Sequence, residues 1–164
     1  LGLTFTKIKK APDITISLAS GLGALADSGL WKESTLKIRN LFDKRDTFVL
    51  EPDEFVLALT HEHVWMPKHL IALVEGRSTY ARVGLSMHQT APWIQPGWDG
   101  HITLEIRNSG PLKIELTPII DMPCQLTFFQ LTSALKDHQA YGSRATDTFQ
   151  HQKRAIPKRR KSRR

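Results

Sequence analysis

The sequence predicts an all-β protein, mainly strands with one or two short helices. Three short apolar runs follow one another from residue 46 to residue 75: DTFVLEP, EFVLALT and HLIALVE. Pro52-Asp53 and Pro67-Lys68 interrupt these runs, and their spacing of roughly ten residues is typical of a β-sandwich or β-barrel. Sustained helical periodicity is absent from the sequence, so the strand pattern decides the fold class.

The remaining strands are predicted from shorter patterns. Residues 1–10, LGLTFTKIKK, alternate like the end of a strand. Further strands are expected at residues 101–108, 112–117 and 124–131. Between residues 11 and 45 the GLG triplet lacks the third glycine of a dinucleotide fingerprint. We therefore interpret that part as a surface loop or a short helix.

The length and composition indicate one globular domain, which we expect to cover residues 1–152. The chain has 164 residues, of which 40% are hydrophobic and 24% charged. It shows no run long enough to span a membrane and no signal peptide, so we expect a cytoplasmic protein. The first residue is Leu1 rather than Met, which indicates that N-terminal residues are missing. Cys124 is the single cysteine, which excludes an internal disulfide and a thiolate zinc site and favours a small buried hydrophobe.

The net charge of +7 is concentrated at the C-terminus. Residues 153–164, KRAIPKRRKSRR, hold 8 of the 23 basic residues and no acidic one. Removing those 8 from the 23 leaves 15 basic against 16 acidic residues, a nearly neutral body. The charge therefore does not indicate a nucleic-acid-binding domain. We interpret residues 153–164 as a solvated, disordered tail, with contacts to RNA or a phosphate ligand as the alternatives.

A polar turn follows the third apolar run. Ser78 is a suitable N-cap, and Thr79–Arg82 has the length of one helical turn that Gly84 would end. The side chains of Ser78 and Arg82 would point the same way, beside Arg77. This arrangement has the form of an anion site, because N–H groups, hydroxyls and guanidinium groups converge. A capped helix with solvated arginines fits the same residues.

The strand at residues 101–108 has two unlike faces. Ile102, Leu104 and Ile106 alternate with polar residues, so the apolar face is expected in the core. Glu105 lies mid-strand on the other face, where it is either a solvent-exposed glutamate or a functional carboxylate. His61 and His63 share one face of an earlier strand, but no third metal ligand is obvious. We therefore expect a structural or surface role for these two histidines.

Two segments together resemble the dCTP deaminase family, within the dUTPase-related superfamily. They are GRSTYARVGL at residues 76–85 and HQTAPWIQPGWDGHITLEI-x-NSG at residues 88–110. The resemblance extends from about Asp46 to Gln152 and preserves the order and spacing of several motifs. The opening LGLTF is similar to the end of the family's early strand, which implies that the family's N-terminal segment is missing from this chain.

The resemblance implies a distorted β-barrel or jelly-roll-like (β-clip) subunit in a homotrimer with active sites between subunits. Glu105 corresponds to the family's catalytic glutamate, the general base on a water that attacks C4 of cytosine. Ser78, Arg82 and Ala91 correspond to catalytic residues that hold the water or stabilise the intermediate. The implied substrate-binding residues are Arg77, Ser78, Thr79, Arg82, Thr90, Gln95, Thr103, Glu105, Tyr141, Thr148 and Gln152.

The resemblance implies no zinc and no tightly bound cofactor. Zinc deaminases use H-x-E with P-C-x-x-C, whereas Pro123-Cys124 is followed by no second cysteine. Mg²⁺ is expected only as the counter-ion of the triphosphate. The implied ligand is dCTP, with dTTP as an inhibitor; membrane and nucleic-acid partners are not implied.

Residues 133–152 resemble the family's nucleotide lid, and the chain departs from the family's pattern at two positions in or just after this lid and at one position in the earlier I-D-P-G loop. Thr148 stands where the family usually has a lysine on the phosphates, and Arg154 stands where it has a glycine. Gln95 replaces the aspartate that meets the deoxyribose 3′-hydroxyl and, in dUTP-hydrolysing relatives, activates water. Glutamine can hydrogen-bond a hydroxyl but is no general base, so Gln95 favours deamination without dUTP hydrolysis.

The resulting functional hypothesis is a dCTP deaminase that converts dCTP and water to dUTP and ammonia. The first alternative is a bifunctional deaminase–diphosphatase, which Gln95 disfavours. The second alternative is a family member that binds nucleotide without turning it over and uses its basic tail for a partner contact. Thr148, Arg154 and the missing N-terminal segment motivate that second alternative.

Overall fold

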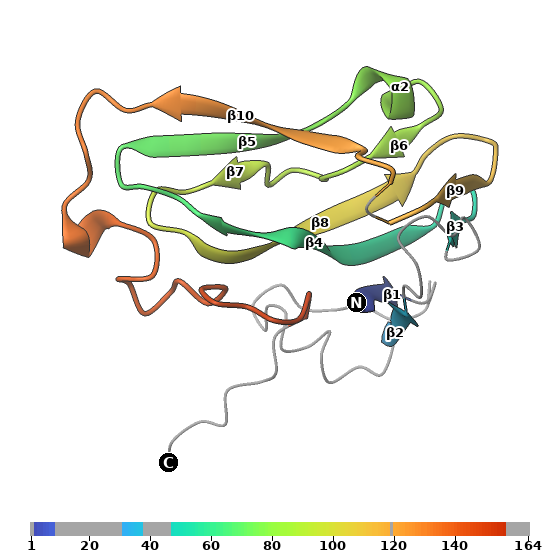
Figure 1. The fold of residues 1–164 in the computed structure, drawn as a ribbon, viewed down its shortest axis with the longest axis horizontal. Helices are drawn as coiled ribbons and strands as arrows, with labels where there is room; N and C mark the ends of the chain where they lie inside the picture. Colours follow the sequence, from blue (N-terminus) through green and yellow to red (C-terminus); the bar gives the residue numbers. More distant parts are fainter. Residues whose placement is uncertain (1, 9–30, 38–46, 119, 157–164) are drawn as a thin grey trace, which may run out of the picture.

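The computed structural model describes residues 2–8, 31–37, 47–118 and 120–156, with backbone alone for the first two segments. These residues form an all-β fold, as the sequence predicts (Figure 1). Its only helices in the described ranges are the four-residue α2 (Ser78–Ala81) and the 3₁₀ turn η2 (Asp137–Gln139). The strands are β1 (Gly2–Ile8), β2 (Trp31–Lys37), β3 (Phe48–Leu50), β4 (Phe55–Trp65), β5 (Leu70–Gly76), β6 (Leu85–Ser86), β7 (Trp93–Ile94), β8 (Asp99–Asn108), β9 (Ile114–Leu116) and β10 (Cys124–Gln130).

The described strands form three antiparallel groups and do not close into one continuous barrel. The largest sheet has the order β2-β1-β4-β8-β6, and the others are β10-β5-β7 and β3-β9. β4 and β8 are the longest pair, running from Phe55 opposite Arg107 to Trp65 opposite Asp99. Their register shifts between Leu59 and His63, which marks a β-bulge in the middle of the pair.

The expected strands are confirmed in type and order, but the sequence pattern missed the two-residue strands β6 and β7 as well as β2, which lies where a surface loop or a short helix was expected. Its residues, WKESTLK, alternate polar side chains with only a weak apolar signal, so pairing with β1 decides its conformation. The GLG triplet lies outside the described residues. The predicted helical turn exists as α2, but Ser78 is its first helical residue rather than its N-cap. Arg77 occupies the N-cap position and makes no side-chain capping bond, which corrects the prediction.

The core lies between the sheets, and β8 supplies one wall of it. Ile102, Leu104 and Ile106 are buried, while the residues between them are less buried, so the expected alternation along this strand is confirmed. Cys124, in β10, is half-buried against the same core, and burial raises the pKa of its thiol. The sequence therefore predicts the core face of the central strands correctly.

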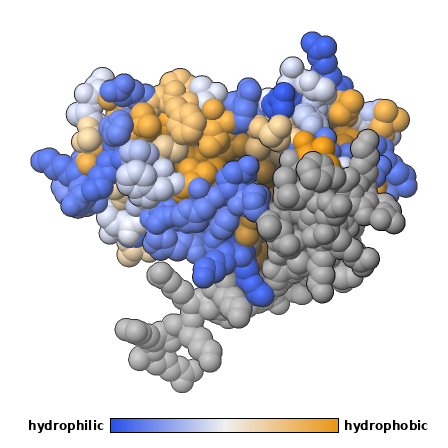
Figure 2. All heavy atoms as spheres, viewed as in Figure 1, coloured by the Kyte–Doolittle hydropathy of each residue, from blue (hydrophilic) through white to orange (hydrophobic). Residues whose placement is uncertain are grey.

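Large apolar side chains are exposed on the three-stranded sheet β10-β5-β7. Figure 2 shows hydrophobic residues among hydrophilic ones in the upper half of the view, where Figure 1 places β10 and β5. Phe128, Phe129 and Trp93 are exposed, and the rings of Trp93 and Phe129 lie 6.2 Å apart. Neither α2 nor any other helix within the described residues has the length and apolar character needed to cross a membrane.

The packed chain continues beyond Gln152, where the sequence places the start of the tail. Ala155 and Ile156 are buried against Leu57 of β4, close to Phe55 and Leu59. These are the aliphatic residues of the segment KRAIPKRRKSRR. The free energy gained by burying them offsets the conformational entropy that is lost when this part of the chain is ordered. Residues 157–164 lie outside the described part of the chain.

Candidate active site

A cavity of about 450 Å³ lies between β8, the turn before it and the C-terminal segment, which we define as residues 140–156. It has the volume of a small-molecule site. Six of the residues implied by the family resemblance line it: Ala91, Gln95, Thr103, Glu105, Tyr141 and Gln152. A second cavity of about 250 Å³ lies on the other face of β4 and β8 and is mainly apolar.

Glu105 is fixed in the wall of the larger cavity. It lies opposite Leu57 in the β4–β8 pair, and its Oε2 accepts the backbone N–H of Gln89 at 3.0 Å. The side-chain amide of Gln89 donates to the backbone carbonyl of Glu105 at 3.2 Å and to Ser86 Oγ at 3.3 Å. The loop before β7 therefore holds the carboxylate through one oxygen, and Oε1 accepts no hydrogen bond from the described residues.

The turn before β8 brings the C-terminal segment close to the sheet. Gly97 has φ +89°, and a Cβ there would lie 2.8 Å from Ala140 Cβ and 3.0 Å from the Tyr141 backbone nitrogen. The N–H of Tyr141 donates to the Pro96 carbonyl at 2.8 Å, and the Tyr141 ring packs 5.2 Å from the Trp98 ring. Burial raises the pKa of the Tyr141 hydroxyl. Glycine at position 97 is therefore required for this close approach.

Gln152 attaches the C-terminal segment to β8 beside the cavity. Its Nε2 donates to Thr103 Oγ1 at 2.7 Å and to the His101 carbonyl at 2.9 Å. Its Oε1 is buried and has no hydrogen-bond partner within the described residues. Because a buried polar oxygen without a partner is costly, this atom marks a place where a ligand donor would be stabilised.

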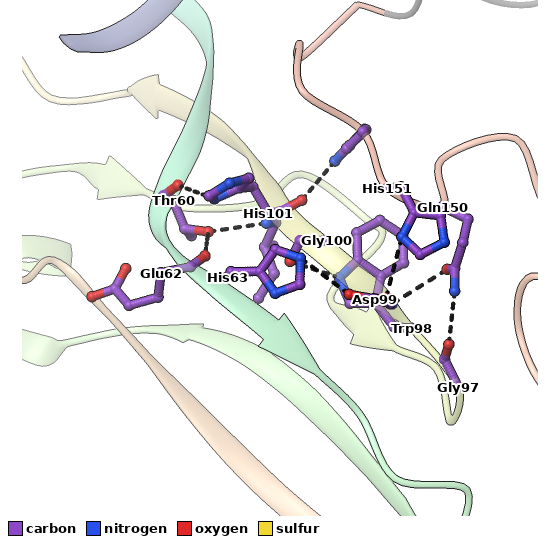
Figure 3. Close-up of polar contacts among 12 residues, drawn as sticks. Thr60, Glu62, His63, Gly97, Trp98, Asp99, Gly100, His101, Gln150 and His151 are labelled. Atoms are coloured by element: carbon purple, nitrogen blue, oxygen red, sulfur yellow. Dashed lines mark hydrogen bonds and ion pairs between the residues drawn. The ribbon is translucent and has the colours of Figure 1, made fainter. Parts of the chain in front are cut away.

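Asp99 joins the C-terminal segment to the bulged end of β4 (Figure 3). One carboxylate oxygen lies 3.0 Å from His63 Nε2 and the other lies 3.2 Å from His151 Nδ1. His151 has φ +56° and donates its N–H to the Asp99 carbonyl at 2.8 Å. His63 thus has a structural contact, as expected, and His61 is exposed. Within the described residues, no group of three or more His, Cys, Asp or Glu side chains could hold a metal ion.

Gln150 supports this junction from the neighbouring position. Its Oε1 accepts the backbone N–H of Asp99 at 3.3 Å, and its Nε2 donates to the Gly97 carbonyl at 3.0 Å. Figure 3 shows Gln150 and His151 side by side over the start of β8. Consecutive residues of the C-terminal segment therefore contact the sheet with both backbone and side chain.

The residues around α2 lie apart from the cavity. α2 packs beside β6, at the end of the molecule away from the C-terminal segment (Figure 1). None of its implied site residues lines the cavity: Arg77, Ser78, Thr79 and Arg82. All four are exposed, and Arg77 Nη1 donates to the Met122 carbonyl at 3.3 Å. Thr90 and Thr148 are also exposed and lie outside the cavity lining.

Sequence reasoning missed several residues of the cavity wall. Trp93 and Trp98 line it within the quoted motif, and Phe149 lines it from the C-terminal segment. Large aromatic side chains flanking a Pro-Gly turn were the available signal for the two tryptophans. Asp147 also lines the cavity, with a side chain only 5% exposed. Burial raises its pKa, but hydrogen bonds from Arg144 and Gly142 outweigh burial, so the pKa of Asp147 lies below the ordinary value.

Comparison with a solved structure shows the fold of the chain, and comparison with a family model shows its family. The crystal structure of 2′-deoxycytidine 5′-triphosphate deaminase from Agrobacterium tumefaciens superposes with a TM-score of 0.64 at 19% identity, over 82% of this chain and 38% of that one. This likeness shows that the chain has the β-clip fold of that structure. A family model described as dCTP deaminase-like matches residues 31–131, more than half of the chain. The protein belongs to the dCTP deaminase-like family.

Individual relatives support the same membership. A Methanothermobacter thermautotrophicus protein named "dCTP deaminase, dUMP-forming" is 44% identical over 97 residues, 59% of this chain and 49% of the relative. A Pseudoalteromonas translucida protein named "dCTP deaminase" is 35% identical over 127 residues, 77% of this chain and 64% of the relative. The chain spans about half the length of most curated relatives that it matches.

Proposed function

We propose that the protein deaminates dCTP, with Glu105 as the general base. The observation that carries this proposal is the placement of Glu105: its carboxylate lines the cavity and is held by the Gln89 N–H through one oxygen only. The relatives named dCTP deaminase supply the substrate class. Gln152 and Tyr141 line the same cavity, which supports their proposed role in a nucleotide lid.

The proposed reaction needs one group that both accepts and returns a proton. Glu105 takes a proton from water as the oxygen attacks C4 of the cytosine ring, which gives a tetrahedral intermediate with the amino group still attached. N3 of the ring takes up the remaining proton of the attacking water, and the same carboxyl passes its proton to the amino group. The bond between C4 and the amino nitrogen then breaks, ammonia leaves, and uracil with its C4 carbonyl remains. A positioned carboxyl of this kind contributes about 10²- to 10⁴-fold to the rate.

We further propose that the site is completed by α2 of a second copy of the chain. Arg77, Ser78, Thr79 and Arg82 lie outside the cavity of their own chain and present exposed side chains. The family resemblance assigns them to phosphate binding and to stabilisation of the intermediate. A homotrimer with shared sites reconciles that assignment with their position. Neither zinc nor another resident cofactor is part of the proposal, and Mg²⁺ accompanies the triphosphate.

A second candidate function is deamination followed by hydrolysis of the triphosphate to dUMP. The names of several relatives, "dCTP deaminase, dUMP-forming", favour it. Gln95 opposes it, because an amide lining the cavity cannot act as a general base. The product therefore distinguishes the two functions. We propose dUTP as the product of this chain and treat dUMP as the alternative.

One assay separates these functions. The purified protein is incubated with dCTP and Mg²⁺, and the products are identified by mass spectrometry, with Glu105→Gln as the matched variant. dUTP with ammonia supports the first proposal, whereas dUMP with pyrophosphate supports the second. Nucleotide binding without either product would indicate a homologue that binds without turnover. Undiminished activity of Glu105→Gln would overturn the proposed role of this residue.

A further inference from the structure

Gln95 reaches the cavity from the turn before β8, and its carboxamide also touches the C-terminal segment. Its Oε1 accepts a hydrogen bond from Arg144 Nη2 at 3.1 Å. Arginine has donors only, so the opposite orientation of the amide would set the N–H groups of both side chains against each other. The contact therefore orients the Oε1 atom of Gln95 toward Arg144, so the NH₂ group of Gln95 points away from Arg144.

Arg144 is itself held in place by Asp147. Arg144 Nη2 lies 3.0 Å from Asp147 Oδ1, and Arg144 Nε donates to Oδ2 at 3.2 Å. Oδ2 also accepts the backbone N–H groups of Gly142 at 2.9 Å and Arg144 at 3.0 Å. A planar guanidinium that a carboxylate holds through both Nε and Nη2 of one edge has little freedom to turn. Asp147 thus makes Arg144 a rigid partner for Gln95.

We propose that Arg144 is a positioning residue that turns the N–H donors of Gln95 toward the cavity. This wall of the site then selects a ligand that offers a hydrogen-bond acceptor, a sugar or phosphate oxygen of the nucleotide. An aspartate at position 95 would present acceptors only, so the Asp147–Arg144–Gln95 chain of contacts gives the site a different preference. The identity of the ligand rests on the proposed function; the orientation of the amide does not.

Binding of dCTP to two variants of Gln95 tests the donor role. Gln95→Glu keeps the shape and the contact with Arg144 but exchanges the NH₂ group for an oxygen, and Gln95→Met removes the amide without adding charge. Quenching of the fluorescence of Trp93 and Trp98, which line the cavity, measures the affinity. We expect about tenfold weaker binding for both variants, the loss of one hydrogen bond to an oxygen of a charged ligand. Native-like binding by Gln95→Met would overturn the donor role. Any weaker binding by Gln95→Glu would then be explained by repulsion between its added negative charge and the nucleotide.

Arg144→Met tests the positioning role, with Lys68→Met as its matched control. Lys68 pairs with Asp137 at η2, outside the cavity lining, so this control also removes an exposed cation from an ion pair. Arg144→Met frees the amide to rotate, and we expect dCTP binding to weaken about threefold or more. Lys68→Met should bind like the native chain. Equal affinity of Arg144→Met and Lys68→Met would overturn the positioning role.

A measurement without nucleotide separates this inference from the proposed function. The unfolding free energies of Gln95→Met, Arg144→Met and the double variant form a double-mutant cycle. Non-additive effects support the fixed amide, and additive effects overturn it. If the native chain binds no dCTP, the proposed function fails and inorganic triphosphate becomes the binding probe. Absence of binding to that probe as well would overturn the donor role.

Discussion

The cavity along β8 and the turn around α2 carry similar polar groups, but the chain holds them in different ways. In the cavity, Glu105 and Gln152 are each hydrogen-bonded to another part of the same chain. Around α2, the side chains of Ser78, Thr79 and Arg82 make no hydrogen bond within the described residues, and all three are exposed.

The backbone of the α2 turn is nevertheless well fixed. Tyr80 donates its hydroxyl to Asp121 Oδ1 at 3.0 Å, and burial followed by this contact raises the pKa of Tyr80. Gly84 ends the turn with φ +92°, against the backbone of Gly110. The turn therefore presents its polar side chains from a rigid base. This contrast teaches that a single chain fixes the polar groups of the cavity by its own contacts and presents the polar groups of the α2 turn to solvent.

The largest expected effect comes from separating the two regions onto different chains. Glu105→Gln should lose about 10²- to 10⁴-fold in kcat, and Arg82→Ala should also be inactive. If sites form between copies, reassembly of an equal mixture should restore about a quarter of the sites. A restored site needs its Glu105 from an Arg82→Ala chain and its Arg82 from a Glu105→Gln chain, and each of these has a chance of about one half. Deaminase activity across mixing ratios measures the recovery. Mixtures that stay inactive at every ratio would place both residues in one chain's site.

Next in size is the effect of a side chain at Gly84, which ends the α2 turn. A Cβ there would lie 2.3 Å from the Gly110 backbone nitrogen, at a φ of +92°. Gly84→Ala should therefore destabilise the fold by about 3 kcal/mol or more, since both strain and a backbone clash must be relieved. Urea unfolding measures the loss. Gly76→Ala is the control, because its Cβ meets only Met87 Cγ at 3.9 Å, and similar losses for both variants would contradict the argument.

A smaller effect is expected at Gly97, which lies beside the cavity. Gly97→Ala must push Ala140 and Tyr141 away, and the C-terminal segment can yield more easily than the backbone around Gly110. We expect a loss of about 2 kcal/mol or less. The N–H of Tyr141, bonded to the Pro96 carbonyl at 2.8 Å, should exchange with solvent faster than in the native chain. Unchanged exchange at Tyr141 would show that position 97 does not hold the segment.

The smallest effect concerns pH. Because the pKa of Asp147 is lowered in the folded chain, its ionised form stabilises the fold above the ordinary carboxyl pKa of about 4. That contribution is lost as the pH falls below 4 and through the lowered pKa. The stability difference between the native chain and Asp147→Asn should therefore shrink from pH 6 to pH 3 in urea unfolding. Asp137→Asn, at an exposed ion pair, should show a smaller dependence.

The sequence predicts the parts of the molecule that depend on local pattern. The alternation of Ile102, Leu104 and Ile106 with polar residues identifies both faces of β8, and thereby the orientation of Glu105. The resemblance places Tyr141 and Gln152 over the cavity, since their positions follow the order of the motifs. Both the alternation along a strand and the order of the motifs can be read from the sequence, because they depend only on residues that are neighbours along the chain.

The rest depends on contacts between distant segments. β2 has a mostly polar sequence, and its pairing with β1 across the intervening chain cannot be read from its own residues. Ser78 has the chemistry of an N-cap, but the helix begins at Ser78 and Arg77 takes that position. The contact of Arg144 with Gln95 joins residues that lie 49 positions apart and needs the turn at Asp147. Such contacts appear only once the chain has folded.

The C-terminal segment has a consequence for the lifetime of any bound nucleotide. Residues 140–156 form neither helix nor strand, and they lie on the sheet through single contacts such as those of Gln150 and Gln152. Releasing the segment would break these contacts one by one and leave the β4–β8 ladder intact. The residence time of a ligand in the cavity would then follow the opening rate of this short stretch of chain, independently of how stable the sheet beneath it is.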